Sequence, residues 1–294
     1  MGPRRALWTA AHACEPSTWL PTRRTQCTAH RSTQLTRVVN KRTKGIGRAV
    51  AVALSRAGAE VALLDRNAES ARDAATWINT NLEAAGAGGR ARHFGVDVSS
   101  MRDVERAVGE AVEEFRGGSE LRVAVNCAGI TVDRFMSKMT EEEWSKVIAV
   151  NLSGTFFVTK AVSDAIVRAQ NGAPPARMGT GGSIVNVSSI IAKIGNLGQA
   201  NYAASKGGVV SFTKTAAKEL ARSQIRCNCI LPGFISTPMA DAVPDKVKAK
   251  LVPTIPLGAF GDPEHIADVA VFLASDLSAY VTGAAIEVTG GFHM

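Results

Sequence analysis

The stretch GIGRAVAVALSRAGAEVALLD, residues 45–65, contains one complete helix followed by one complete strand. From Gly47 to Ala57 apolar residues recur at helical spacing, and Gly58 stands where a left-handed residue commonly ends a helix. The apolar run Glu60–Asp65 is typical of a strand that is buried on both faces. Before the helix, Gly45-Ile46-Gly47 is typical of a loop that binds phosphate at a helix N-terminus.

The same alternation of strand and helix continues to the C-terminus. The other predicted strands are LTRVVN (35–40), ARHFGVDV (91–98), LRVAVN (121–126), SIVNVS (183–188), IRCNCIL (225–231) and AAIEVTG (284–290). The predicted helices cover 67–85, 100–115, 140–169 with a capping box of Thr140 and Glu143, 202–222, and a segment that opens at Asp262-Pro263. This order predicts an α/β fold: a doubly wound, Rossmann-type parallel sheet with helices on both faces, in a single domain over residues 35–294.

The positive charge of the chain belongs to its N-terminal part. The formal net charge is +8, and nine of the 34 basic residues but only one of the 26 acidic residues lie in residues 1–44. The remaining 250 residues carry 25 basic and 25 acidic groups, so no binding to nucleic acid is expected. Residues 1–34 are rich in Arg, Thr, Ser and Ala, and are expected to be a disordered leader, either a transit peptide or a wrongly assigned exon.

The cysteines and histidines show no metal-ligand spacing, so no metal site is expected. Cys227 and Cys229 lie two apart in a predicted strand, and they are expected to share one face as small buried hydrophobic residues. An odd number of cysteines without a disulfide pattern favours a reducing compartment. Since no run of about 18 apolar residues occurs, no membrane span is expected.

Three polar residues have the spacing of a proton-transfer site. Tyr202 and Lys206 lie four apart, one turn along the same face of a predicted helix, and Ser189 precedes the tyrosine by thirteen residues at a strand end. A phenol has an ordinary pKa of about 10, and a neighbouring positive charge lowers that pKa by stabilising the phenolate. The alternative is a surface tyrosine and a solvated lysine on an amphipathic helix.

With these residues, the sequence from residue 45 to 294 resembles the short-chain dehydrogenase/reductase family. Further motifs that carry the resemblance are NCAG at 126–129, VNLSG at 150–154, NVSS at 186–189 and LPG at 231–233. The resemblance implies that Tyr202 exchanges a proton with the substrate oxygen, that Ser189 holds this oxygen by a hydrogen bond, and that Lys206 binds the nicotinamide ribose. It also implies that Asn151 anchors a water that relays protons through Lys206; a polar residue inside a helix is the alternative for Asn151.

The resemblance further implies NAD as the cofactor. The residues expected to bind it are Gly45, Ile46, Gly47, Asp65, Arg66, Asp97, Val98, Asn126, Ala128, Gly129, Tyr202, Lys206, Pro232, Gly233, Ile235 and Thr237. Asp65 ends a strand, where a carboxylate accepts hydrogen bonds from ribose hydroxyls and repels the 2′-phosphate of NADP, whereas Arg66 could pair with that phosphate. Asp97 is expected to hydrogen-bond the adenine or, alternatively, to cap the following helix.

Within the family, three stretches resemble 3-oxoacyl-(acyl carrier protein) reductases and 17β-hydroxysteroid dehydrogenases: residues 193–206, 226–239 and 288–291. This implies NAD-dependent interconversion of 3-hydroxyacyl and 3-oxoacyl thioesters in mitochondrial fatty acid synthesis, of 17β-hydroxysteroids and ketosteroids, or of both. It also implies a homo- or heterotetramer with a related reductase, acyl carrier protein as a candidate partner, and the mitochondrial matrix, with the cytoplasm as the alternative. The irregular segment Phe234–Gly258 is expected to select the substrate.

The segment NKRTKGIG, residues 40–47, departs from the family pattern TGxxxGxG in its first half. Counting back from Gly45 puts Lys41 at the turn glycine and Asn40 at the threonine. A side chain at a turn with positive φ costs on the order of 1 kcal/mol or more. The predicted strand Leu35–Asn40 also places Arg37 at the centre of a buried sheet. Either the cationic side chains replace backbone donors, or the sequence before Gly45 is not the native one. The rival function is therefore a catalytically weak scaffold subunit of a hetero-oligomeric reductase.

Overall fold

The structure is a computed structural model, and it describes residues 34–40, 45–83, 90–115, 119–241 and 245–293. Every described element belongs to the unit Gln34–Met294. The predicted leader lies outside the described residues except for Gln34, which begins the first strand. The first half of the glycine-rich loop, residues 41–44, and the side chains of that first strand also lie outside them, so the predictions for Lys41 and Arg37 remain predictions.

The described strands form one parallel sheet in the order β3-β2-β1-β4-β5-β6-β7. Their bounds are β1 Gln34–Asn40, β2 Glu60–Asp65, β3 Ala91–Gly95, β4 Ser119–Asn126, β5 Gly182–Val187, β6 Ile225–Pro232 and β7 Ala285–Val288. Strand order reverses between β1 and β4, which is where ligands bind in open α/β sheets. The doubly wound, Rossmann-type prediction is confirmed.

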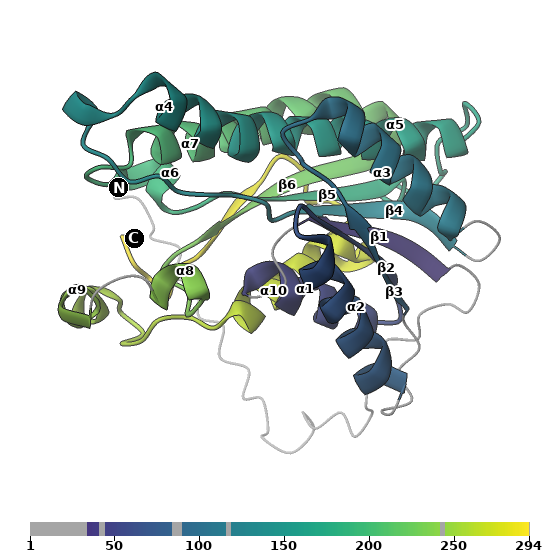
Figure 1. The fold of residues 1–294 in the computed structure, drawn as a ribbon. Helices are drawn as coiled ribbons and strands as arrows, with labels where there is room; N and C mark the ends of the chain where they lie inside the picture. Colours follow the sequence, from purple (N-terminus) through teal and green to yellow (C-terminus); the bar gives the residue numbers. More distant parts are fainter. Residues whose placement is uncertain (1–33, 41–44, 84–89, 116–118, 242–244, 294) are drawn as a thin grey trace, which may run out of the picture. The chain divides into compact units, whose positions relative to one another are not determined.

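Helices cover both faces of this sheet (Figure 1). One face packs against α1 Ile46–Arg56, α2 Ala68–Glu83 and α10 Pro263–Ala274; the other packs against α3 Met101–Glu114, α5 Gly154–Ala169 and α7 Ala200–Leu220. Side chains of one strand alternate between the two cores, since Leu63 of β2 joins the first and Leu64 joins the second. The edge strand β7 differs, because Ala285 and Glu287 are exposed on one of its faces.

The predicted helix over residues 140–169 is not one regular helix. The capping box of Thr140 and Glu143 opens α4 Glu141–Ile148 as expected, but residues Ala149–Ser153 then form a π-helical turn before α5. Such turns are rare and frequently occur at functional sites. Asn151 lies in the π turn and is buried.

Short helices complete the loops around the carboxyl ends of the strands. They are η1 Met136–Lys138, α6 Ile191–Ile194, α8 Pro238–Asp241, α9 Asp245–Leu251 and η4 Val252–Thr254; η3 Ala221–Ser223 and η5 Asp276–Ser278 lie elsewhere. The segment Phe234–Gly258, expected to be irregular, thus contains two short helices and a 3-10 turn. A small apolar cluster of Ile190, Ile255 and Phe292 packs beside it.

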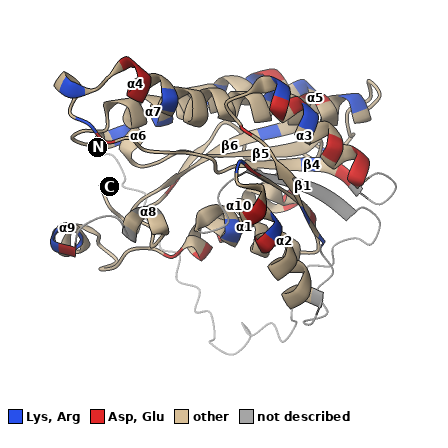
Figure 2. Cartoon of the chain, in the orientation of Figure 1, with Lys and Arg blue, Asp and Glu red and all other residues tan. Residues whose placement is uncertain are grey.

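Cys227 and Cys229 lie on β6, and both are buried against α7, which confirms their expected role as small hydrophobic residues. Burial raises the pKa of the Cys227 thiol to about 12 and that of the Cys229 thiol to about 11. Figure 2 shows acidic and basic residues interspersed on the helices, while most of the sheet carries neither. Among the described helices, none has the length and apolar content to cross a membrane.

Candidate active site

The predicted site residues gather at the carboxyl edge of the sheet. Asp65 ends β2, Asn126 ends β4, Ser189 follows β5 by two residues, and Pro232 ends β6. Gly45 begins α1 close to the end of β1. Because carboxyl ends of parallel strands share one edge, residues more than 180 positions apart in the sequence converge near the switch point, where the ligand crevice lies in open α/β sheets.

Ser189, Tyr202 and Lys206 lie together, as their spacing predicts. The side chains of Ser189 and Tyr202 are hydrogen-bonded, and the ammonium nitrogen of Lys206 lies 5.8 Å from the centroid of the Tyr202 ring. Lys206 is only 4% exposed, and its Nζ donates a hydrogen bond of 2.8 Å to the carbonyl oxygen of Val187 at the end of β5. The alternative of a solvated lysine is therefore wrong, because α7 places this face against the sheet rather than in solvent.

The protonation of Tyr202 differs from the sequence prediction. The pKa of Tyr202 is raised above its ordinary value, chiefly because the phenol is buried, while the hydrogen bond with Ser189 opposes the shift and the charge of Asp133 adds to it. The Lys206 ammonium donates to the Val187 carbonyl oxygen, and the lowering expected from Lys206 together with an oxidised nicotinamide ring remains a prediction. The chain's own groups therefore keep Tyr202 protonated, which is the form that can donate a proton.

Asn151 fixes the loop that follows β4. Its amide oxygen accepts a hydrogen bond of 2.8 Å from the backbone N–H of Ile130, and its amide nitrogen donates to the Ile130 carbonyl oxygen at 2.9 Å and to Ser205 Oγ at 3.0 Å. The Ser205 hydroxyl in turn donates to the carbonyl oxygen of Tyr202 at 2.8 Å. The side chain thus connects the π turn, the loop after β4 and the catalytic face of α7. The water relay expected of Asn151 remains a prediction.

Several supporting residues were not found from the sequence. Ser188 Oγ donates to the Lys206 carbonyl oxygen at 2.7 Å, which joins the end of β5 to α7. Asn201 is buried and donates to the carbonyl oxygens of Val132 and Glu143, at 3.1 and 3.2 Å, while its own oxygen accepts the Tyr202 N–H at 2.7 Å. These residues are adjacent to recognised motif positions, and that adjacency is the only signal in the sequence that could have indicated them.

The described half of the glycine-rich loop has the features of a phosphate site. Gly45 is the N-cap of α1 with φ +88°, a conformation that favours glycine, so the first N–H groups of α1, at Ile46 and Gly47, follow a residue without a side chain. A Cβ on Gly45 would lie 3.2 Å from Thr237 Cγ2. The structure thus brings Thr237 beside the loop, as the cofactor prediction requires. These residues fit the pyrophosphate of a dinucleotide.

Asp65 is buried at the end of β2, and Oδ1 of its carboxylate accepts the N–H of Asn67 at 2.9 Å. This bond holds the turn into α2 and fixes the carboxylate beside the crevice. Arg66 next to it is exposed. The placement fits an acidic residue that meets the ribose of a bound dinucleotide, with Arg66 outside the core.

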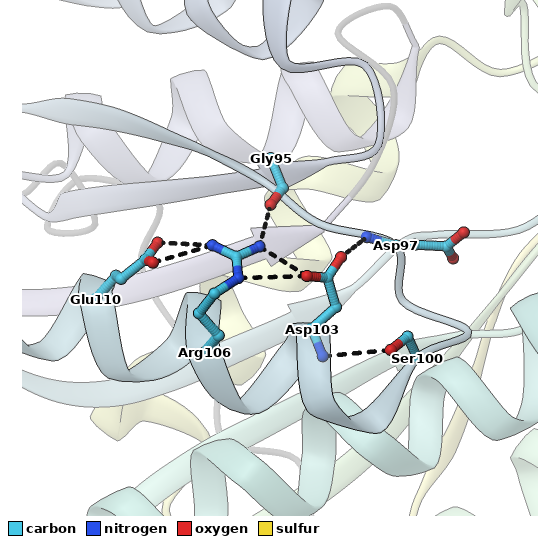
Figure 3. Close-up of polar contacts among 6 residues, drawn as sticks. All are labelled: Gly95, Asp97, Ser100, Asp103, Arg106 and Glu110. Carbon is cyan, nitrogen blue, oxygen red and sulfur yellow. Dashed lines mark hydrogen bonds and ion pairs between the residues drawn. The ribbon is translucent and has the colours of Figure 1, made fainter.

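Asp97 is not the N-cap of α3, so that alternative is wrong. Ser100 is the N-cap and accepts the N–H of Asp103, whereas Asp97 Oδ1 accepts from the N–H and the hydroxyl of Ser99, at 2.9 and 2.6 Å. Figure 3 shows the backbone N–H of Asp97 donating to Asp103, with the Asp97 carboxylate directed away from that contact. Arg106 binds Asp103 and the Gly95 carbonyl oxygen. This network lowers the pKa of Asp103 and holds the loop that contains Val98.

Asn126 belongs to a buried polar ladder rather than to the open edge of the crevice. Its amide nitrogen donates to Asn186 Oδ1 at 2.8 Å and to Thr159 Oγ1 at 3.0 Å, and Asn186 continues to Thr213. These bonds join β4, β5, α5 and α7, so the side chain of Asn126 supports the edge that would bind the cofactor.

Two glycines of the cofactor motifs lie close to neighbouring atoms: a side chain at Gly233 would clash with backbone, and one at Gly129 would be tightly packed. A Cβ on Gly129 would lie 3.2 Å from Lys206 Nζ and 3.4 Å from Asn151 Oδ1, and one on Gly233 would lie 2.8 Å from Thr289 Cα. Ala128, beside Gly129, is half-buried, and Pro232 accepts the N–H of Ile190 at 2.9 Å. Ile235 is buried and pairs with Gly261 in an isolated bridge. The glycines thus let the backbone approach the catalytic groups closely.

Comparison with known proteins assigns this fold and site to a family. The family model described as enoyl-(acyl carrier protein) reductase matches residues 41–293, which is most of the chain. The chain therefore has the fold of a nicotinamide-dependent oxidoreductase. Its doubly wound sheet carries a tyrosine and a lysine, one helical turn apart, at its carboxyl edge. The chain belongs to the short-chain dehydrogenase/reductase family.

Two of three individual relatives match more than four fifths of the chain, and the third matches about half of it. The (3R)-3-hydroxyacyl-CoA dehydrogenase of Mus musculus is 48% identical over 252 residues, which are 85% of this chain and 93% of that protein. The 3-oxoacyl-(acyl-carrier-protein) reductase FabG of Thermotoga maritima is 41% identical over 247 residues, 84% of this chain and 93% of that protein. Estradiol 17-beta-dehydrogenase 8 of Callithrix jacchus is 56% identical over 142 residues, 48% of this chain and 99% of that protein.

A solved structure agrees with these relatives. The crystal structure of a protein described as a short-chain alcohol dehydrogenase, from Sinorhizobium meliloti 1021, has a TM-score of 0.78 and 30% sequence identity. It covers 89% of this chain, and this chain covers 97% of it.

Proposed function

We propose that the protein is an NAD-dependent dehydrogenase that interconverts 3-hydroxyacyl and 3-oxoacyl thioesters. The observation that carries the proposal is the group of Ser189, Tyr202 and Lys206 beside Asn151, with Ser189 and Lys206 buried and Tyr202 half-buried, in a chain 48% identical to a (3R)-3-hydroxyacyl-CoA dehydrogenase. The acyl reductase from Thermotoga maritima supports the same substrate class. An intact proton-transfer group favours an active enzyme over a scaffold subunit.

The chain's own groups can perform the proton chemistry of this reaction. When bound, the nicotinamide ring supplies the hydride for reduction and accepts it in oxidation. Tyr202 would donate its phenolic proton to the oxygen of a 3-oxo group, and would take that proton back in the oxidation of a 3-hydroxy group. Ser189, already hydrogen-bonded to Tyr202, would hold the same oxygen. Lys206 lies close enough to the Tyr202 ring to stabilise the phenolate left behind.

Exposed apolar side chains near the site support an apolar substrate. Leu197 is 84% exposed, five residues before Tyr202, and Met136 lies two residues after Arg134, whose N–H donates to the Gly198 carbonyl oxygen. Leu257 is 81% exposed in the segment expected to select the substrate. Exposed large apolar residues that flank a catalytic group are typical of a surface that binds an apolar ligand, such as an acyl chain.

The second candidate substrate is a 17β-hydroxysteroid, which is also apolar and carries a secondary alcohol or ketone. The observation in its favour is the 56% identity to estradiol 17-beta-dehydrogenase 8 over 142 residues. Proton transfer by Tyr202 is the same for both substrates, so the catalytic residues do not separate them.

We further propose a homo- or heterotetramer with a related reductase, acyl carrier protein as a partner, and the mitochondrial matrix as the compartment. The support for the compartment is the basic, acid-poor composition of residues 1–34, and the support for the carrier partner is the similarity to the acyl carrier protein reductase. Fluorescence microscopy of the full chain tagged after residue 294, with and without residues 1–34, tests the compartment.

A titration of the purified full chain with NADH, followed by fluorescence, tests the function together with a rate assay. We expect a dissociation constant for NADH below the millimolar range. In the rate assay we expect NAD-dependent oxidation of one of the two enantiomers of a 3-hydroxyacyl-CoA. Estradiol in the same assay tests the second candidate. A dissociation constant far above the millimolar range, with neither substrate oxidised, would support the scaffold subunit instead.

Replacing Asp65 by alanine is expected to narrow the preference for NADH over NADPH by about tenfold, because the carboxylate no longer repels a 2′-phosphate. The ratio of the two dissociation constants is the measurement. Asp73→Ala, which removes an exposed carboxylate farther along α2, is the control and should leave the ratio unchanged. A ratio that stays the same in Asp65→Ala would assign the preference to Arg66 or to the basic residues 41–44.

Replacing Asn40-Lys41 by Thr-Gly is expected to lower the dissociation constant for NADH and to raise kcat/KM, each by about five- to tenfold. The reason is that glycine removes roughly 1 kcal/mol of backbone strain from the turn. Thermal stability should rise as well. Lys218→Ala, which removes an exposed lysine on α7, controls for the loss of one positive charge. Weaker binding, most marked at low salt, would mean that Lys41 itself binds the phosphates.

A further inference from the structure

We propose that the C-terminal tail Gly290–His293 supports the substrate-binding segment, and that Phe292 is a positioning residue for the substrate. The inference rests on the proposed function, because it concerns the affinity of the same site for its thioester substrate. It adds a specificity element that lies about 90 residues beyond Tyr202 in the sequence. The cofactor side of the crevice is predicted to be independent of it.

Phe292 is the centre of a small apolar cluster beneath the segment from Phe234 to Phe260. Its ring contacts that of Phe234 edge to face, with centroids 5.0 Å apart, and Phe234 stacks on Phe260 with centroids 5.4 Å apart. Ile255 is buried in the same cluster. Such aromatic contacts each contribute beyond the area they bury. Phe292 therefore contacts the start of the segment that is expected to select the substrate, and Phe234 links this contact to Phe260 beyond the segment's end.

The backbone of the tail fits the segment so closely that side chains are excluded. Gly290 has φ +64°, and a Cβ there would lie 2.9 Å from Ile255 Cγ2. Gly291 has φ +87°, and a Cβ there would lie 2.9 Å from Pro256 Cγ. The N–H of Leu257 donates to the Gly290 carbonyl oxygen at 3.1 Å. The position of Leu257, which is highly exposed, is thus set by the tail.

The same cluster reaches the catalytic serine. Ile190 and Ile191, the two residues after Ser189, both belong to it, and Ser189 Oγ accepts the N–H of Ile191 at 3.2 Å. The Phe292 cluster therefore lies between the catalytic strand end and the substrate segment. Loss of Phe292 should loosen the substrate segment first, because Ser189 has a second anchor in Tyr202.

The test is steady-state kinetics of Phe292→Ala with a 3-oxoacyl-CoA substrate. We expect KM to rise by about five- to tenfold while kcat changes by less than about threefold, the pattern of lost ground-state binding. The dissociation constant for NADH should stay within about twofold. Phe292→Leu should restore most of the affinity. Hydrogen exchange of residues 252–261 should accelerate in Phe292→Ala but not in Phe292→Leu.

Two matched controls separate positioning from general instability. Phe115 is as buried as Phe292, at 3% against 5% exposure, but lies at the end of α3, so Phe115→Ala should lower stability and leave KM unchanged. If Phe292→Ala does not fold, Gly290→Ala tests the same contact through Ile255. Its control is Gly172→Ala, which has a similar φ of +81° and no atom within 4 Å of the added Cβ.

The inference would be overturned if Phe292→Ala and Gly290→Ala both fold and both keep the wild-type KM, provided that the wild-type chain oxidises or reduces the thioester. Equal loss of NADH affinity and substrate affinity would also overturn it, because the tail would then support the whole crevice. A wild-type chain without thioester activity would instead contradict the proposed function, and the hydrogen-exchange comparison would still decide whether the tail holds the segment.

Discussion

Tyr202→Phe is expected to lower kcat by about 10³-fold, the scale of a lost general acid, while NADH binding changes by no more than a few-fold. The phenol is hydrogen-bonded to Ser189, and burial raises its pKa, which favours the protonated form. Phenylalanine retains the ring that packs near Lys206, so the variant removes the hydroxyl and little else. Single-turnover kinetics and NADH fluorescence give the two quantities separately.

The chain provides its own control, because Tyr280 is its one other tyrosine. Tyr280 is 88% exposed, and Tyr280→Phe should leave kcat unchanged. Equal losses of NADH affinity and of turnover in Tyr202→Phe would contradict the assigned role. In the wild-type chain, reduction should slow as pH rises through the pKa of Tyr202, because the donor form disappears, whereas oxidation should accelerate.

Asn151→Ala is expected to lower the free energy of unfolding by about 3 kcal/mol, because three partly or fully buried groups each lose a hydrogen bond, and a group left unsatisfied costs about 1–3 kcal/mol. The groups left behind are the N–H and carbonyl oxygen of Ile130 and the hydroxyl of Ser205. Turnover should fall by roughly tenfold or more, since Ile130 follows Gly129, which lies against Lys206. Chemical denaturation and kcat/KM are the measurements.

Asn81→Ala is the matched control for this variant. Asn81 is also a helical asparagine, but it is exposed and donates only to the Trp77 carbonyl oxygen, at 2.8 Å. Its replacement should change stability by less than about 0.5 kcal/mol. A stability loss in Asn151→Ala no larger than that of Asn81→Ala would show that the three bonds of the π turn contribute little.

Local sequence patterns were sufficient for the elements of the fold. The strand Glu60–Asp65 was predicted with both of its ends, and the helix of Tyr202 begins two residues earlier than expected. The strand predicted over 91–98 ends at Gly95 in the structure. The chain turns into α3 from Val96 to Ser100, and a hydrogen bond from the Asp97 N–H to the Asp103 carboxylate holds this turn. A hydrophobic period identifies an element, but its last residue depends on contacts that are distant in the sequence.

The site shows the same division. Spacing alone placed Tyr202 and Lys206 on one face, because four residues are one helical turn. The π turn around Asn151 could not be predicted, since it depends on hydrogen bonds to Ile130, 21 residues away. The raised pKa of Tyr202 was missed for a similar reason: burial and the charge of Asp133 act through the folded arrangement. The first half of the glycine-rich loop remains a prediction.

The position of β1 in the interior of the sheet, between β2 and β4, has a consequence for synthesis of the protein. On the ribosome, Gln34–Asn40 is made first among the strands that the structure describes, yet one of its two partners is β4, which ends at Asn126. At roughly 5–20 residues per second, one edge of β1 stays open for on the order of ten seconds. An unpaired strand edge is a template for aggregation. A nascent chain interrupted before Asn126 would therefore need a chaperone on that edge. The apolar residues of β1 and β2 would already have been made, but β4 would not yet be complete.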